Sequence, residues 1–101
     1  MFKHVTANGN ICDAKTLTAL DNPFANGAPN AFLFVSPIFG VGYHVEVEYY
    51  GSSPPAGCPA NRWFLWQDGA DWAPGEAVNV LVINGDIFGS KPPPGKTHRV
   101  R

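Results

Sequence analysis

The chain has 101 residues, of which 45% are hydrophobic and 15% are charged, so it can bury the core of one domain and is not a disordered segment. Its formal net charge of −1 comes from eight acidic and seven basic residues, a balance that argues against a nucleic-acid interface, which needs clustered Lys and Arg. Every apolar run is shorter than the roughly 20 residues that a membrane-spanning helix needs, so we expect no membrane insertion.

Glycine and proline interrupt the chain at short intervals, with 11 Gly and 10 Pro in total. This spacing predicts short strands joined by turns rather than helices. In chain order, the predicted strands cover residues 2–7, 16–20, 31–36, 43–50, 62–67 and 77–83, with a possible short edge piece at 86–88. We therefore predict an all-β domain, either a compact antiparallel sandwich or a small barrel of six or seven short strands.

Two of these strands carry patterns that predict different burial. Residues 31–36 form a continuous apolar run, which indicates a strand covered on both faces. Residues 43–50 alternate instead, with one face made of Tyr43, Val45, Val47 and Tyr49 and the other made of His44, Glu46, Glu48 and Tyr50. We expect the face that carries the two glutamates to be exposed.

The segment between the second and third predicted strands is rich in turn residues. Asp21 or Asn22 can cap a single helical turn that Pro23 opens, and Gly27 can close this turn in a left-handed conformation. We therefore expect one helical turn near residues 23–27. The residues to which we assign this structural role are Asp21, Asn22, Asn26, Gly27 and Asn30.

The end of the chain differs from the rest in composition. Three consecutive prolines at 92–94 favour extended polyproline geometry, and the only basic cluster follows them as a solvated terminus. We predict a single β domain over residues 1–88 and a Pro-rich extended tail or linker over residues 89–101.

Cys12 and Cys58 are the only cysteines, and they lie too far apart in sequence for a metal knuckle or a thioredoxin-like motif. Both fall in predicted loops, where the alternatives are a disulfide between them and two free thiols. A loop disulfide and a low charge content favour an extracytoplasmic location. Residues 1–5 run directly into strand-like sequence, so we expect any signal peptide to be absent from this chain.

Several short motifs follow one another along residues 2–83. The most specific are Leu-Asp-Asn-Pro at 20–23, Asn-Gly-Ala-Pro-Asn-Ala at 26–31 and Asn-Val-Leu-Val at 79–82, with a His-containing strand at 44–47. In this order they resemble a bacterial β-rich domain of unknown activity, found singly or in tandem in exported and surface proteins. The resemblance implies an all-β fold outside the cytoplasm and brings no catalytic residues. The pair Cys12 and Cys58 departs from that pattern.

Glu46 and Glu48 share one face of a predicted strand, about 7 Å apart at their Cα atoms. Paired carboxylates at such separations act as acid and base in glycoside hydrolysis. Catalytic carboxylates usually come from different strands across a cleft, so we predict a non-enzyme. A small glycan hydrolase that uses Glu46 and Asp68 remains a minor alternative.

Asp68 and Asp71 flank a Gly-Ala pair in a predicted loop. Such a loop can supply oxygen ligands to Ca²⁺, but two carboxylates fall short of the six to eight oxygens that this ion takes, and Asx-turn hydrogen bonding is the alternative. No spacing brings His4, His44 and His98 together, and we interpret His4 and His44 as half-buried residues bonded to backbone. We therefore predict no cofactor and no metal, with Ca²⁺ at 68–71 as the weak alternative.

The aromatic residues of the second half form the remaining candidate site. In the strand 62–67, Trp63 faces one side and Trp66 the other, so one of these faces fills the core and the other lies under a loop or is exposed. Trp72 is the tryptophan that we expect to be exposed. An exposed aromatic surface among polar groups stacks on sugar rings or receives a protein. The predicted ligand-binding residues are Trp66, Asp68, Asp71 and Trp72.

These observations favour a non-catalytic extracytoplasmic binding module whose partner is a glycan or a protein surface. The alternative is a structural subunit of a surface assembly, in which copies of the chain pair through their terminal strands.

Overall fold

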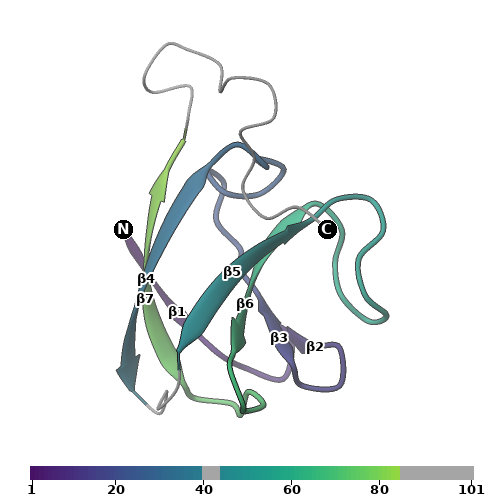
Figure 1. The fold of residues 1–101 in the computed structure, drawn as a ribbon, viewed down its shortest axis with the longest axis vertical. Helices are drawn as coiled ribbons and strands as arrows, with labels where there is room; N and C mark the ends of the chain where they lie inside the picture. Colours follow the sequence, from purple (N-terminus) through teal and green to yellow (C-terminus); the bar gives the residue numbers. More distant parts are fainter. Residues whose placement is uncertain (40–43, 85–101) are drawn as a thin grey trace.

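The computed structural model describes residues 1–39 and 44–84, and within these ranges the chain forms seven strands and no helix. The strands are β1 (Phe2–Val5), β2 (Ile11–Cys12), β3 (Leu17–Ala19), β4 (Phe32–Phe39), β5 (Val45–Tyr50), β6 (Arg62–Gln67) and β7 (Ala77–Ile83). Figure 1 shows them as the two layers of a small sandwich, which confirms the predicted all-β class. The predicted strand at 86–88 and the tail at 89–101 lie outside the described residues.

Both sheets are antiparallel. One has three strands in the order β1-β7-β4, and the other has four in the order β2-β3-β6-β5. The hairpins β2–β3 and β5–β6 stay within the four-stranded sheet, whereas each of the other connections takes the chain from one sheet to the other. The described segments after β1, β3 and β6 therefore carry the chain from one layer to the other.

The main core fills the space between the sheets. Trp63 and Leu65 point inward from β6, where they meet Val78 and Val80 of β7, and all four side chains are buried. Tyr49 of β5 packs edge-to-face on Trp63, with ring centroids 5.4 Å apart, and its burial raises the pKa of its hydroxyl. Trp63 and Leu65 thus belong to the face of β6 that fills the core.

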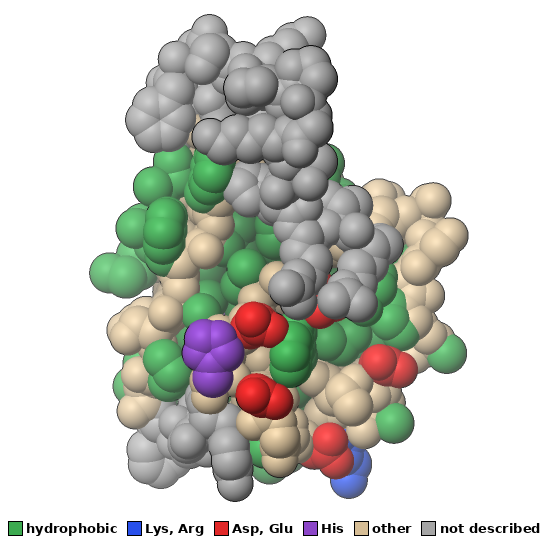
Figure 2. Space-filling view, viewed as in Figure 1, with side chains coloured by type: hydrophobic (Ala, Val, Ile, Leu, Met, Phe, Trp, Pro, Cys, Tyr) green, Lys and Arg blue, Asp and Glu red, His purple; other side chains and the backbone are tan. Residues whose placement is uncertain are grey.

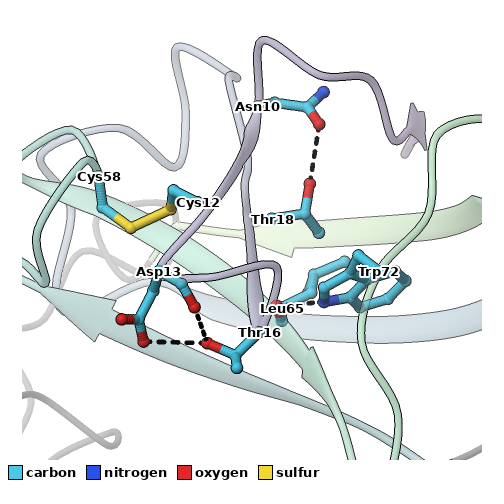
Figure 3. Close-up of a disulfide and its surroundings, with 8 residues drawn as sticks. All are labelled: Asn10, Cys12, Asp13, Thr16, Thr18, Cys58, Leu65 and Trp72. Atoms are coloured by element: carbon cyan, nitrogen blue, oxygen red, sulfur yellow. Dashed lines mark hydrogen bonds between the residues drawn. A yellow bond between two sulfur atoms is a disulfide. The ribbon is translucent and has the colours of Figure 1, made fainter.

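The opposite, outer face of the four-stranded sheet carries a second, smaller apolar cluster. Phe64 of β6 is completely buried there beside Leu17 and Ala19 of β3, and Cys58 from the segment between β5 and β6 packs against them. Cys58 is joined to Cys12 of β2 by a disulfide, with 5.4 Å between the Cα atoms (Figure 3). The disulfide alternative is therefore correct, although Cys12 lies in a strand and not in a loop.

The strand β4 departs from the prediction that residues 31–36 are covered on both faces. Leu33 and Val35 pack inward, but Phe34 is 57% exposed. The prediction was wrong because β4 belongs to a three-stranded sheet that is covered by the other sheet on one face only. The pairing of β4 with β7 also shifts in register between Pro37 and Phe39.

The segment after β3 forms the single turn expected near residues 23–27. Asn22 accepts a hydrogen bond from the backbone N–H of Phe24 at its side-chain oxygen, and the N–H of Asn26 donates to the Asn22 carbonyl at 2.8 Å. Gly27 follows with a φ of 68°, in the left-handed region that favours glycine. Asp21 accepts a hydrogen bond from the Asn26 amide at 2.8 Å, and Asn30 is exposed.

A buried hydrogen-bond chain joins the two sheets. Nε2 of His4, on β1, lies 2.8 Å from the hydroxyl of Thr18, on β3 of the other sheet. The Thr18 hydroxyl donates its single proton to the side-chain oxygen of Asn10 at 3.0 Å, so His4 Nε2–H is the donor to Thr18 (Figure 3). The expected backbone partner of His4 is therefore replaced by a side chain, because β1 faces β3 across the core.

Burial lowers the pKa of His4 below its usual 6.5. His4 of the unfolded chain binds a proton near pH 6.5, whereas buried His4 of the folded protein binds it only at a lower pH. The neutral, buried His4 therefore contributes its full stability above pH 6.5, and this contribution is lost as the pH falls. We expect the free energy of unfolding to drop between about pH 7.5 and about pH 5, by up to about 1.4 kcal/mol per pH unit from this residue. Urea unfolding at both pH values measures it. His4→Gln should remove this part of the slope, and an unchanged slope in that variant would contradict the assignment.

Candidate functional site

Trp72 is not the exposed aromatic residue that the sequence suggested. Its side chain is 2% exposed and belongs to the main core. Its indole N–H donates to the carbonyl of Leu65 at 3.1 Å, and its backbone N–H donates to the carbonyl of Lys15 at 2.8 Å (Figure 3). The prediction was wrong because the loop between β6 and β7 crosses from one sheet to the other, which places its largest apolar side chain between them.

A hollow of about 560 Å³ lies on the outer face of the four-stranded sheet, and we call it the outer hollow. Its described lining consists of Thr16, Leu17, Glu48, Tyr50, Trp66, Gln67, Gly69, Ala70 and Asp71. Two of the four predicted ligand-binding residues, Trp66 and Asp71, thus lie in one lining, whereas Asp68 is exposed on the adjacent turn and is not part of it. The other lining residues were not among those predicted to bind a ligand.

The pairing of β5 with β6 sets the composition of the sheet beneath the outer hollow. Glu46 is directly opposite Trp66, and Glu48 is directly opposite Phe64. Tyr50 packs edge-to-face on Phe64, with ring centroids 5.4 Å apart. On this face, carboxylates of β5 therefore lie beside aromatic rings of β6. Figure 2 shows acidic side chains lying among hydrophobic ones on the side of the molecule where β5 faces the viewer.

The two glutamates that share this face differ in burial. Glu48 is only 5% exposed, so the expectation of an exposed glutamate face is wrong at this position. It is buried because its neighbours on the same face are the rings of Phe64, Trp66 and Tyr50, which shield it from water. Glu46 is half-buried, and its carboxylate lies 3.8 Å from Nε2 of the exposed His44.

One wall of the outer hollow is the hairpin between β2 and β3, whose backbone is strained. Asp13, Ala14 and Lys15 have φ angles of 52°, 52° and 72°, in the left-handed region. Each such non-glycine residue costs about 1–3 kcal/mol. The hydroxyl of Thr16 donates to both the carbonyl and the carboxylate of Asp13, at 2.7 and 2.9 Å (Figure 3). The hairpin contains no glycine, the residue that most often adopts this conformation, and we did not predict it from the sequence.

The opposite wall is the turn that follows β6. Gln67 is bridged to Ala70, and its side-chain amide donates to the carbonyl of Asp71 at 3.2 Å. Gly69 has a φ of 84°, a conformation in which a side chain is strained. Both walls are thus held by local hydrogen bonds, so the shape of the outer hollow is largely preformed.

Trp66 carries an unusual polar atom. Among the described residues, its indole nitrogen is a buried side-chain atom with no hydrogen-bond partner. Unsatisfied buried donors are uncommon because leaving one unpaired costs about 1–3 kcal/mol. A phenylalanine in its place avoids this cost but buries less apolar surface.

The two histidines that the structure describes are not brought together. His4 is bonded to Thr18 in the core, and His44 is exposed beside Glu46, so the expectation of a half-buried His44 is wrong. His98 lies outside the described residues. Within residues 1–39 and 44–84, no three His, Cys, Asp or Glu side chains cluster in a way that could hold a metal ion.

The same part of the chain contains no helix with the length and apolar character needed to cross a bilayer. No protein-family model, curated protein or solved structure matches this chain.

Proposed function

We propose that this chain is a non-catalytic, extracytoplasmic binding module whose ligand is a carbohydrate held in the outer hollow. The observation that carries this proposal is the combination, in one lining, of the rings of Trp66 and Tyr50 with the polar groups of Glu48, Gln67 and Asp71. Aromatic rings stack on the C–H faces of sugars, and carboxylates and amides bond to sugar hydroxyls. The volume, about 560 Å³, is within the range of small-ligand sites.

The extracytoplasmic location rests on separate support. The disulfide between Cys12 and Cys58 persists in oxidising compartments and is rare in the cytoplasm. Fractionation of the source cells and their medium, followed by immunoblotting for the chain, tests it, and a chain confined to the cytosolic fraction contradicts it.

The carbohydrate proposal is tested on a glycan array with the wild-type protein and the variant Trp66→Ala. We expect the wild type to bind a subset of glycans, and the variant to bind them at least about tenfold more weakly, about 1.4 kcal/mol. Phe24→Ala is the matched control, because Phe24 is 66% exposed in the turn after β3 and does not line the outer hollow. Circular dichroism confirms that each variant is folded. Binding to no glycan, or equal binding by Trp66→Ala, contradicts the proposal.

A second candidate function is self-association, which one observation favours. Phe34 of β4 lies directly opposite Leu81 of β7 on the outer face of the three-stranded sheet, and the two are 57% and 40% exposed. In the described part of the chain, β1 and β4 are also the unpaired edges of this sheet. Size-exclusion chromatography over a concentration series tests this candidate, and a strict monomer at all concentrations contradicts it.

A further inference from the structure

The charged side chains in the described lining of the outer hollow are both acidic. Among its described lining residues, Glu48 and Asp71 are the charged ones, and no lysine, arginine or histidine is present. Lys15, next in sequence to the lining residue Thr16, instead lines a separate hollow of about 310 Å³ together with Trp72 and Pro74. The described lining therefore disfavours anionic ligands and favours cations.

The two carboxylates occupy different depths. Asp71 is an exposed lining residue, whereas Glu48 is almost completely buried in the sheet. Between these depths, the aromatic side chains of Trp66 and Tyr50 are half-buried. The face of such a ring attracts a cation as well as the C–H groups of a sugar. A ligand that carries both a cationic group and a sugar ring therefore suits the carboxylates and the aromatic rings of the described lining.

We infer that the ligand is an amino sugar with a free, protonated amine, such as a glucosamine unit of a partly deacetylated polymer; this inference rests on the proposed carbohydrate function. The ring stacks on Trp66, and the ammonium group lies near Asp71, where a charge-assisted hydrogen bond is stronger than a neutral one. N-acetylation removes the charge, and an acidic sugar is repelled by the Asp71 carboxylate.

The test compares three oligosaccharides of equal length by isothermal titration calorimetry, at low salt and at a slightly acidic pH. These are a glucosamine oligomer, an N-acetylglucosamine oligomer and a galacturonic acid oligomer. We expect the glucosamine oligomer to bind at least about tenfold more tightly than the N-acetylated one, about 1.4 kcal/mol, and the acidic one not to bind. The preference should shrink as salt is added, because Asp71 is exposed and its interactions are screened.

Asp71→Asn should abolish the preference while the N-acetylated oligomer keeps its affinity. Asp68→Asn is the matched control, since it makes the same charge change at an exposed site on the same turn outside the lining. Equal binding of the glucosamine and N-acetylglucosamine oligomers overturns the inference and leaves the carbohydrate proposal in place. A preference that both variants weaken equally also overturns it, because it then reflects overall charge. If no oligosaccharide binds, here or on the array, both proposals fail.

Discussion

Replacing both cysteines, in the variant Cys12→Ala/Cys58→Ala, should lower the free energy of unfolding by about 4 kcal/mol. This value is the loop-closure entropy expected for a cross-link between residues 46 positions apart, and it is a large part of the 5–15 kcal/mol that stabilises a typical domain. The bond also holds Cys58 and its loop against Phe64 on the outer face, so this face should loosen first.

Urea unfolding of the variant and of the wild type, with and without a reductant, measures this effect. Reduced wild type should match the double variant, because both lack the cross-link. The reductant should leave the unfolding of the double variant unchanged, because this variant has no disulfide to reduce. The double variant therefore controls for other effects of the reductant. A loss of less than about 1 kcal/mol in both the variant and the reduced wild type contradicts the expectation.

Trp72→Ala should lower the free energy of unfolding by about 3–5 kcal/mol, the range for removing a buried aromatic side chain. Trp72 is 2% exposed, and its indole N–H bonds to the carbonyl of Leu65 at 3.1 Å. The substitution leaves a cavity between the sheets and an unpaired carbonyl. Trp72→Phe should cost less, because the ring still fills most of the space and only the hydrogen bond and part of the volume are lost.

Phe24→Ala, at a 66% exposed position, should change the free energy of unfolding by no more than about 0.5 kcal/mol and so serves as the control. The same variants decide between the two interpretations of Trp72. If Trp72→Ala is as stable as the wild type and loses glycan binding, Trp72 is a ligand contact, as the sequence suggested, and its burial in the core is wrong.

The strands could be predicted from the sequence because their signals are local. The alternation in residues 43–50 and the apolar runs at 31–36 and 77–83 identify β5, β4 and β7 to within a few residues. The Asn22 turn was predictable for the same reason, since its capping hydrogen bond spans two residues. Each of these features is fixed by side chains that are close together in the chain.

The candidate site was only half predictable because its residues depend on how distant segments stack. Trp66 and Asp71 were found from their neighbourhood, but the role of Glu48 depends on its register with Phe64. The exposure of Trp72 was predicted wrongly, because the residues around it indicate a loop but do not show whether that loop lies over the core or in solvent. The wall at Thr16 depends on a left-handed hairpin that lacks glycine, the usual sequence signal of this conformation.

The proline in β4 limits how copies of this protein can join edge to edge. A strand added along an open edge needs backbone N–H donors in sequence, and Pro37 has none. The shift in register between Pro37 and Phe39 also bends the strand away from a regular ladder. Growth into fibrils along this edge is therefore restricted to the stretch before Pro37, so the exposed Phe34 is better placed for face-to-face packing than for an extending sheet.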